Sequence, residues 1–455
     1  MLDPSCGEGQ FIAGHRKSVG IERDAKAAQQ ARTLAPWALV HEGEFFEWAA
    51  NTKERFECAA GNPPFIRYQT FNGETRKQAL SLSKAVGAEF SGLASSWAPF
   101  LAVTASLLKQ GGRMAFVVPA EIGHAPYAAP LLEYLVSHFS SVHIVAIKEK
   151  IFPALSEDCW LLRTSGYGGN TRHIDFSIVE RFRPSPAPPP VSIRIPFDDC
   201  KTLWNRRLRP YLISNGARIL YQTLAHHERS QRFGEFATIG IGYVSGANDF
   251  FHLRPSDARK LGIPDSLLHP TVRNSRVLPA KLLTGSVVQK WWADDDPMLL
   301  LRLGKDERLP RQVQVYLDTE QAREARKSYK CSNREPWYSV PDVQIPDYFL
   351  SYMSGRRPSL VRNGAGCTCT NSVHSVRAKD RGSVTALAQH WDNPFIQLSC
   401  ELEGHPLGGG VLKVEPGEAN RILLPPPGTE RLLNSPVVLE ALQTMREWRN
   451  YSDGN

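Results

Sequence analysis

The sequence predicts an α/β domain, built on a doubly wound and mostly parallel sheet, followed by a mixed α+β domain. Short apolar strands alternate with helical segments up to about residue 165. Polar or glycine-rich turns follow several of these strands, and a proline-rich stretch separates the two halves. Strands that alternate with helices are typical of a parallel sheet with helices on both faces.

Local patterns place the elements of the first half. Apolar runs predict strands at residues 18–21, 56–61, 114–118 and 142–147, and helical patterns cover residues 24–33, 98–110 and 131–138. Gly111 and Gly112 are predicted to cap the second of these helices. Ligands of such sheets bind beyond the carboxyl ends of the strands.

The proline-rich stretch predicts the domain boundary. Four prolines fall within the five positions 186–190. We expect residues 183–190 to form an extended, semi-rigid linker between a first domain, 1–182, and a second domain, 191–455. Residues 451–455 are expected to fray.

Composition narrows the class of protein. The 455 residues are 42% hydrophobic and 22% charged, as in ordinary globular domains. The net charge of +8 and the isoelectric point of about 9.0 favour a polyanionic partner. We expect no membrane span and no signal peptide. The eight cysteines lack paired chelating spacings, so no metal site is predicted and the thiols are expected to be reduced.

Two motifs carry the chemistry, and they lie about sixty residues apart. Asp3-Pro4-Ser5-Cys6-Gly7-Glu8-Gly9 is expected to form the turn after a first strand, and Asn62-Pro63-Pro64-Phe65 follows the strand at 56–61. The glycines allow close approach of a ligand to the backbone, although nucleotide phosphates and purely structural turns use such sequences too. Both motifs fall where a parallel sheet binds its ligands.

These motifs resemble those of the N6-adenine DNA methyltransferases that use S-adenosylmethionine. The stretch from Asp3 to Phe11 is similar to their donor motif, and Asn62-Pro63-Pro64-Phe65 is similar to their catalytic motif. The resemblance covers residues 1 to about 165. The order of the motifs is that of the restriction-modification class with a target-recognition domain last.

The resemblance implies a reaction and a set of partners. It implies methyl transfer from S-adenosylmethionine to N6 of a flipped-out adenine in a specific DNA duplex, catalysed by domain 1–182. Double-stranded DNA is the implied partner, together with a separately encoded restriction endonuclease. The implied setting is the prokaryotic cytoplasm, near the nucleoid.

The resemblance also implies which residues bind the cofactor. Glu22, at the end of the strand 18–21, is expected to accept the ribose hydroxyls. Glu44 is expected to accept from the adenine amino group while Phe45 packs on the ring; either glutamate alone is also typical of a solvated surface charge. The full set of expected cofactor-binding residues is Asp3, Pro4, Cys6, Gly7, Gly9, Phe11, Glu22, Glu44 and Phe45.

The chemistry suits the implied catalytic residues. An amine attached to an aromatic ring is a poor nucleophile because its lone pair is delocalised. The side-chain carbonyl of Asn62 and the backbone carbonyl of Pro63 are expected to accept its two N–H groups and to stabilise the charge that builds on nitrogen. Pro63 and Pro64 stiffen the loop. Phe65 is expected to stack on the base, with Phe152 as a second aromatic.

The second half is expected to recognise DNA. Arg and Asn side chains read base edges, and Lys or Arg side chains neutralise phosphates. Any one of them is also typical of a solvated cation. The expected DNA contacts are Arg273, Asn274, Arg276, Lys330, Arg334, Arg362 and Lys413. Trp291, Trp292, Trp337 and Tyr338 are expected in the core, and no nuclease motif is found.

Two departures from the family leave other functions open. In the family a helix and most of a first strand precede the donor motif, whereas Met1 and Leu2 alone precede Asp3 here, so either the sequence is truncated or the first strand is missing. Arg23 stands where an apolar residue usually packs on the adenine. One alternative is a non-catalytic DNA-binding remnant. The other is an N5-glutamine protein methyltransferase, whose motif is similar but which needs no basic second domain.

Overall fold

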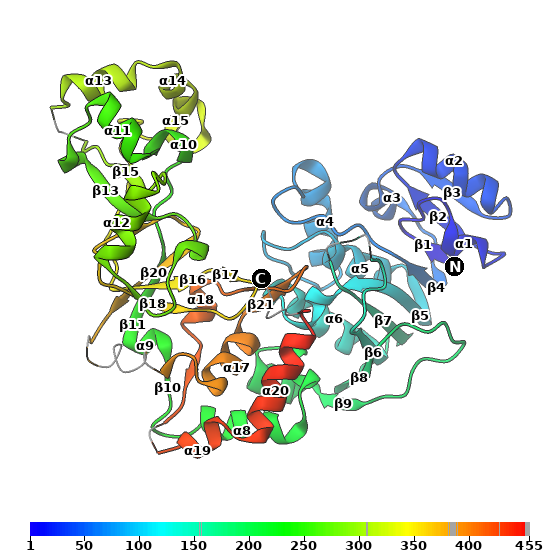
Figure 1. The fold of residues 1–455 in the computed structure, drawn as a ribbon. Helices are drawn as coiled ribbons and strands as arrows, with labels where there is room; N and C mark the ends of the chain where they lie inside the picture. The colour runs from blue at the N-terminus through cyan, green and yellow to red at the C-terminus, as the bar shows by residue number, and fades with distance from the viewer. Residues whose placement is uncertain are drawn as a thin grey trace. The chain divides into compact units, whose positions relative to one another are not determined.

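A nine-stranded sheet organises the first half of the chain in this computed structural model, which describes residues 1–153, 155, 157–305, 308–380, 382, 388, 390–426 and 428–450 (Figure 1). The strand order is β3-β2-β1-β4-β5-β7-β6-β8-β9. The first five strands in this order are parallel, and β7 lies antiparallel between β5 and β6. The mostly parallel α/β sheet predicted from the sequence is confirmed. The strands are β1 (Leu2–Asp3), β2 (Val19–Glu22), β3 (Leu39–Glu42), β4 (Phe56–Gly61), β5 (Leu108–Pro119), β6 (Phe139–Ile147), β7 (Cys159–Tyr167), β8 (His173–Val179) and β9 (Ile193–Pro196).

Helices connect these strands. They are α1 (Gln10–Ala13), α2 (Ala25–Leu34), α3 (Phe45–Asn51), α4 (Gly73–Ala85), α5 (Trp97–Ser106), η1 (Ala120–Gly123), η2 (Pro126–Ala128), α6 (Ala129–His138), α7 (Phe197–Trp204) and η3 (Arg209–Leu212). Helix α2 begins where Asp24 accepts the Ala27 N–H at 2.8 Å, which satisfies one free donor of the first turn. Helix α5 is apolar on all sides and buried.

The predicted end of α5 is wrong. The helix stops at Ser106, and Leu108 already begins β5. Gly111, with φ of 77°, lies in an irregularity where β5 gains residues against β4, since Phe56 pairs with Leu108 but Cys58 pairs with Arg113. The glycine therefore accommodates a bulge in the strand and does not cap the helix.

A first strand is present, so the alternative in which it is missing is wrong. Leu2 is fully buried and pairs in parallel with both Val19 of β2 and Ala59 of β4. Asp3 pairs with Gly20. Two residues are therefore enough to place β1 between β2 and β4 and to fix where the following turn begins.

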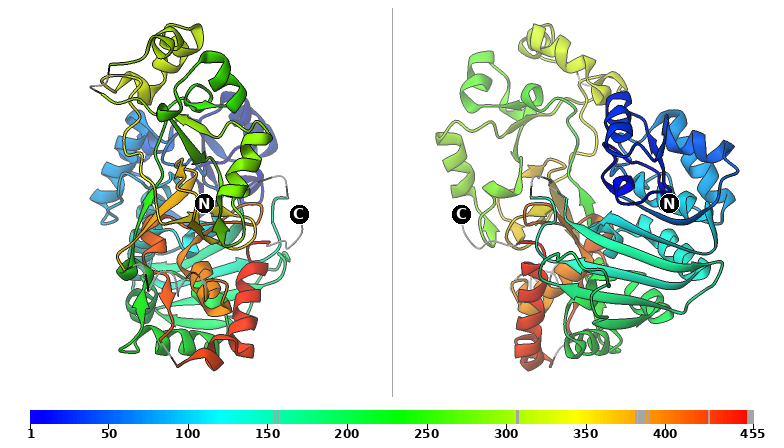
Figure 2. Two further views of the ribbon diagram at one scale, coloured as in Figure 1. Left: turned by 60° about the vertical axis from the view of Figure 1, so that its left-hand side comes forward. Right: turned by 90° about the vertical axis from the view of Figure 1, so that its right-hand side faces the viewer.

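The proline-rich segment does not join two domains. Residues 183–190 connect β8 to β9 of the same sheet, and the hydroxyl of Ser177 donates to the carbonyl of Pro190 at 2.7 Å. The two compact units are Met1–Leu212 and Ile213–Asn455. Prolines lack an N–H group but keep the carbonyl acceptor, so the end of this segment is attached to β8 through the Pro190 carbonyl, whereas residues 183–188 are exposed. The long strands of the sheet lie side by side in Figure 2.

The second unit is a mixed α+β structure with several small sheets. Their orders among the described residues are β11-β20-β16-β18-β14, β12-β15-β13-β19, β17-β22-β21 and β10-β23. The strands are β10 (Gln231–Arg232), β11 (Ala237–Ile241), β12 (His252–Leu253), β13 (Leu268–Val272), β14 (Leu282–Leu283), β15 (Leu299–Leu301), β16 (Tyr348–Ser351), β17 (Met353–Ser354), β18 (Leu360–Asn363), β19 (Thr368–Cys369), β20 (Val373–Ala378), β21 (His405–Leu407), β22 (Val411–Lys413) and β23 (Leu423–Leu424).

Short helices surround these sheets. They are α8 (Asn215–Ala225), α9 (Phe233–Phe236), α10 (Asn248–Phe251), α11 (Pro255–Leu261), η4 (Asp265–Leu267), η5 (Ser275–Val277), α12 (Gly285–Ala293), α13 (Arg311–Leu317), α14 (Glu320–Lys327), α15 (Tyr329–Ser332), α17 (Pro394–Glu403), α18 (Pro416–Ala419), α19 (Glu430–Leu433) and α20 (Pro436–Glu447). Figure 1 shows α10, α11 and α13–α15 at one end of this unit and α8, α17, α19 and α20 at the other.

Two apolar cores hold this unit together. One gathers around Phe250, Phe349 and Trp291, and the other around Phe233 and Trp391. Trp337 and Tyr338 pack against the first core, as expected. Trp292 does not, because 41% of its surface is exposed. The described helices are all too short or too polar to span a lipid bilayer. The expected fraying of residues 451–455 falls outside the described part of the chain.

Candidate active site

The loop after β1 has the geometry of a ligand-binding turn. Gly7 adopts φ of 52°, and no heavy atom lies within 4 Å of the position that a Cβ atom would take. Its N–H group donates to Glu22 Oε2 at 2.9 Å, while the Asp24 N–H donates to Glu22 Oε1 at 2.8 Å. Glu22, at the end of β2, therefore holds this donor loop (residues 3–9) in place. Its carboxylate keeps acceptor capacity beyond these two bonds.

Asp3 is the most unusual group of the donor loop. Its side chain is fully buried; Oδ1 accepts the Ser5 N–H at 3.2 Å, and no partner among the described residues reaches Oδ2. Burial raises the pKa of Asp3 to about 7, and the nearby Glu22 carboxylate adds to this. A buried carboxylate oxygen without a partner is costly, so this atom is prepared for a donor that the chain itself does not supply.

Three other residues of the loop are buried and serve packing. A Cβ atom on Gly9 would lie 2.9 Å from Ala31 Cα of helix α2, so the glycine allows the helix, not a ligand, to approach the loop. Cys6 is buried against Gly20, where a Cβ atom would lie 2.7 Å from the cysteine sulfur. Pro4 is buried as well. The expectation that the Gly9 backbone lies on the ligand is therefore not supported.

Glu44 and Phe45 also have structural roles. Glu44 Oε2 accepts the N–H groups of Phe46 and Glu47, at 2.6 and 3.1 Å, and so caps helix α3. Burial raises the pKa of Glu44. Phe45 is 3% exposed, with its ring centroid 4.4 Å from that of Phe100. The expectation that Phe45 packs on a ligand ring is not supported, because its ring is part of the core.

The loop after β4, residues 62–66, is fixed at both ends. The Ser5 hydroxyl of the donor loop donates to the backbone carbonyl of Asn62 at 3.1 Å. Ser96, at the start of α5, donates its hydroxyl to the carbonyl of Pro64, accepts the Ile66 N–H at 3.0 Å, and donates its own N–H to the Ile66 carbonyl at 2.9 Å. The loop is therefore preorganised without help from a ligand.

The groups that these bonds leave available are acceptors. Within the described residues, nothing donates to the side chain of Asn62 or to the carbonyl of Pro63. Asn62 is exposed, and Phe65 is half-buried. The loop thus presents an amide, a free carbonyl and an aromatic ring close to the end of a strand that neighbours β1.

Phe152 and Phe11 lie elsewhere. Both line a cavity of about 910 Å³ between one face of the sheet and the proline-rich segment, beside Ala60 and Ala115. No residue of the 62–65 motif lines it. The structure does not bring Phe152 and Phe65 together in this cavity, so their joint contact with a base remains a prediction.

The expected DNA contacts are scattered over the second unit. Lys330 and Arg334 line one groove, whereas Lys413 pairs with Glu415 at 2.5 Å and lies over the Tyr352 ring, so it is not a free phosphate ligand. Asn274 Oδ1 accepts the Arg276 N–H at 3.0 Å and caps η5.

The other three expected contacts are arginines, which differ in their exposure and in whether a carboxylate lies nearby. Arg273 lies 4.0 Å from Asp249. Arg276 and Arg362 are exposed.

Sequence reasoning missed Ser5 and Ser96. Serine hydroxyls are common in turns and at helix starts, and Ser95-Ser96 before an apolar helix does signal a helix start. The sequence gives no sign that Ser96 bonds a loop thirty residues earlier. Such a contact is visible only in the fold.

The chain is similar to known proteins along most of its length. Two family models match it: Type II methyltransferase M.Eco57I, C-terminal domain, over residues 205–450, and Eco57I restriction-modification methylase, over residues 17–152. The chain is 19% identical to the type II methyltransferase M.AccI of Acinetobacter calcoaceticus, over 99% of this chain and 84% of that protein.

Two further proteins are similar to this chain, one over part of its sequence and one in its fold. A tRNA1(Val) (adenine(37)-N6)-methyltransferase of Actinobacillus succinogenes is 31% identical over 110 residues, which are 23% of this chain and 43% of that one. The solved type IIL restriction-modification enzyme MmeI, in complex with DNA, has the same fold, with a TM-score of 0.60 and 12% identity over all of this chain and 70% of that one.

The sheet order with an antiparallel β7, and the polar loops after β1, β2 and β4, define a Rossmann-like methyltransferase fold. The family follows from the matched models, one of which covers more than half of the chain. The chain belongs to the restriction-modification type II methyltransferases represented by M.Eco57I.

Proposed function

We propose that this protein transfers a methyl group from S-adenosylmethionine to N6 of an adenine flipped out of a specific DNA duplex, as the modification activity of a restriction-modification system. The observation that carries the proposal is the loop 62–66, which is pinned by Ser5 and Ser96 and leaves two carbonyl acceptors free next to the donor loop.

The donor loop fits S-adenosylmethionine, which supplies an electrophilic methyl group on a sulfonium. Asp3 Oδ2 is a buried acceptor in need of a donor, and an ammonium group meets that need. Gly7 leaves open space beside its backbone, and Glu22 has acceptor capacity for hydroxyls. These three residues support the cofactor assignment, whereas Glu44 caps helix α3 and Phe45 lies in the core.

The loop of residues 62–66, which we call the acceptor loop, fits an exocyclic amine. Asn62 and Pro63 each offer one carbonyl, which matches the two N–H groups of an adenine N6. Carbonyl dipoles fixed in advance stabilise the positive charge that develops on nitrogen as it attacks. Transfer would form the bond from N6 to the methyl carbon as the sulfur–methyl bond breaks, with the thioether product as the leaving group. No base is needed before the attack, because the proton leaves afterwards, from the positively charged nitrogen to solvent. Phe65 offers a ring face to the base.

Adenine as the target draws support from a partial relative. The protein that is 31% identical over 110 residues is named as an adenine N6 methyltransferase that acts on a tRNA. Its substrate is RNA, whereas M.AccI is named as a type II methyltransferase. Duplex DNA is therefore the proposed substrate, and a separately encoded endonuclease stays a prediction.

The test is transfer of label from S-adenosylmethionine to unmethylated genomic DNA, with tRNA as a second substrate, followed by separation of the nucleosides. We expect label in N6-methyladenine from DNA and none from tRNA. Asn62→Ala is expected to abolish transfer while the melting temperature stays unchanged, since Asn62 is exposed. Label in another nucleoside, or in tRNA alone, would contradict the proposal.

A further inference from the structure

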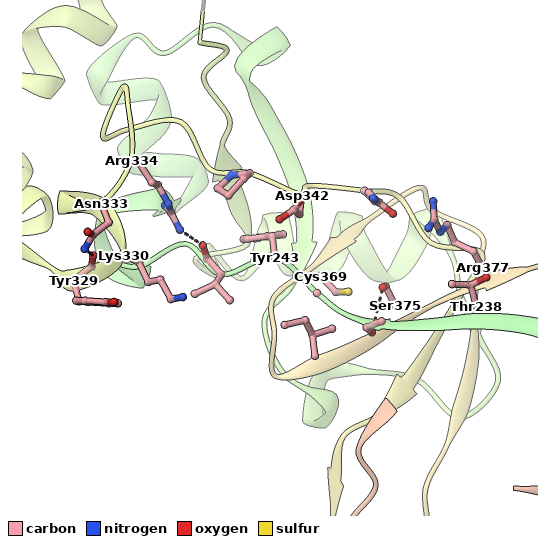
Figure 3. A pocket seen from close by; sticks show the side chains of 16 residues that line it. Thr238, Tyr243, Tyr329, Lys330, Asn333, Arg334, Asp342, Cys369, Ser375 and Arg377 are labelled. Carbon is pink, nitrogen blue, oxygen red and sulfur yellow. Dashed lines mark hydrogen bonds between the residues drawn. The ribbon is translucent and has the colours of Figure 1, made fainter. Parts of the chain in front are cut away.

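A polar groove of about 730 Å³ opens on the second unit along strands β11 and β20 (Figure 3). Its floor comes from side chains that share one face of this strand pair. Thr238 of β11 pairs with Arg377 of β20, and Gly240 pairs with Ser375 two residues along. Strand β11 is an edge strand of its five-stranded sheet, so the groove runs along an edge.

The two ends of the groove both carry positive charge. Figure 3 shows Tyr329, Lys330, Asn333 and Arg334 gathered at one end, and Arg377 at the other beside Thr238 and Ser375. Asp342 contributes one negative charge to the lining of the groove, whereas Lys330, Arg334 and Arg377 contribute three positive charges. The groove therefore favours a polyanion that extends from one end to the other.

The cations differ in how they are held. Arg334 donates to the carbonyl oxygens of Ser245 and Val244, at 2.6 and 2.5 Å, so it fixes the segment next to β11. By contrast, Arg377 and Lys330 are exposed, and no hydrogen bond or ion pair with another described residue engages either side chain. These two side chains are available to a ligand.

The rest of the lining consists of neutral hydrogen-bonding groups on a low floor. Thr238 and Gln344 are exposed and, within the described ranges, also lack side-chain partners. A Cβ atom on Gly240 would lie 3.5 Å from Ser375 Oγ, so glycine keeps the floor open at the centre. Neutral donors and acceptors beside Arg377 on the strand floor are groups that read base edges, whereas a cation at the exposed end suits a phosphate.

Building on the proposed function, we propose that this groove binds duplex DNA, with Arg377 reading a base edge and Lys330 contacting a phosphate. A guanidinium fits the O6 and N7 acceptors of guanine in two parallel bonds, whereas an ammonium acts as a point charge. Arg377 lies on the strand floor beside other polar groups, and Lys330 lies at the exposed end. Sequence reasoning found Lys330 but not Arg377, Thr238 or Gln344.

Equilibrium binding to short duplexes separates the two roles, and it needs no methyl transfer. A random-duplex pool is selected on the full-length chain and sequenced, and the recovered duplexes are then titrated at several salt concentrations. Lys330→Ala is expected to weaken binding to every duplex alike and to lower the slope of log K against log salt by about 1. Lys327→Ala is the matched control, because Glu324 already neutralises Lys327 at 2.5 Å.

Arg377→Ala is expected to reduce discrimination at one position of the selected sequence by about 5- to 150-fold. Arg377→Lys keeps the charge and should restore the salt slope but not the discrimination. Arg326→Ala, on the exposed part of α14, is its control. Unchanged sequence preference in both Arg377 variants, or a wild-type chain that selects no sequence, would overturn the base-reading role. A Lys330→Ala salt slope equal to that of wild type would overturn the phosphate contact.

Failure of this inference is distinguishable from failure of the proposed function. If the selected sequence is bound through Arg377 but receives no methyl group, the groove stands and the methylation proposal falls. If DNA is methylated at a sequence that Arg377→Ala leaves unchanged, the function stands and the groove falls. Preference for single-stranded RNA over the duplex pool would contradict both.

Discussion

The hydroxyl of Ser5 lies 3.1 Å from the backbone oxygen of Asn62, to which it donates. One bond thus joins the loop after β1 to the loop after β4, two strands that are neighbours in the sheet. The donor loop and the acceptor loop are therefore not two independent features of the fold. A shift of either one is transmitted to the other through this contact.

Ser5→Ala is expected to lower kcat by about 10- to 100-fold, since misplacement of reacting groups by about 1 Å has effects of this size. The free energy of unfolding should fall by only about 1 kcal/mol, the net contribution of one hydrogen bond. Methyl transfer and urea unfolding measure the two. Ser106→Ala is the control, because Ser106 bonds within its own helix, to Val103. Equal losses of kcat in both variants would contradict a link between the loops.

Ser96 is expected to matter more for both properties. It is 1% exposed and engages Pro64 and Ile66, so Ser96→Ala leaves two partly buried backbone groups without their partner, at a cost of about 1–3 kcal/mol. We expect a fall in kcat with little change in the Kd for DNA. Ser83→Ala removes a buried serine that bonds only within α4 and should lower stability without changing kcat. A larger Kd for DNA with an unchanged kcat would contradict a role of Ser96 in positioning the loop 62–66.

The raised pKa of Asp3 predicts how the stability of the protein depends on pH. Its pKa is about 7 in the folded protein against an ordinary 3.8, so the folded chain holds an extra proton between these values. Stability should therefore fall as pH rises from about 4 to 7, and the full penalty remains above 7. Asp3→Asn is expected to melt higher than wild type at pH 8, with the difference vanishing near pH 4.

The same ionisation should govern cofactor binding. An ammonium favours ionised Asp3, so affinity for S-adenosylmethionine is expected to rise with pH through about 7 and then level off. Asp3→Asn should bind weakly at every pH in this range. Calorimetric titration at pH 6 and pH 8 measures both affinities. A wild-type affinity that does not change with pH would count against an ionised Asp3 as the ligand.

How far the sequence predicts this structure depends on the range of the interactions. Strand β2, helix α2 and strand β4 follow from apolar runs and the Asp24 cap, all of which are local. Gly111 was misassigned because a glycine pair fits a helix end and a strand bulge equally well, and only the pairing of β5 with β4 decides.

The candidate site shows the same division. The loops after β1 and β4 lie where their motifs predict, because parallel strands bring their carboxyl ends to one edge. The burial of Phe45 against Phe100 and the bonds of Ser96 depend on residues that are distant in sequence. Proline content predicted an extended segment at 183–190, but its attachment to β8 required the position of Ser177.

In the second unit, Arg449 and Glu401 form a buried ion pair. The side chains are 0% and 2% exposed, and Arg449 Nη2 lies 2.9 Å from Glu401 Oε1. The guanidinium also donates to the carbonyl oxygens of Gly410 and Arg356. It thus joins helix α17 to two separate segments of backbone.

Arg449→Met is expected to destabilise the protein by about 3–5 kcal/mol, because it removes the guanidinium that balances the charge of the buried Glu401 carboxylate. Adding Glu401→Leu removes that charge and should recover a large part of the loss, although the two backbone carbonyls stay unpaired. Urea unfolding of the two single variants and the double variant gives the coupling energy. If the double variant is as unstable as the sum of the single ones, the two side chains act independently, and the bonds to the backbone are what Arg449 contributes.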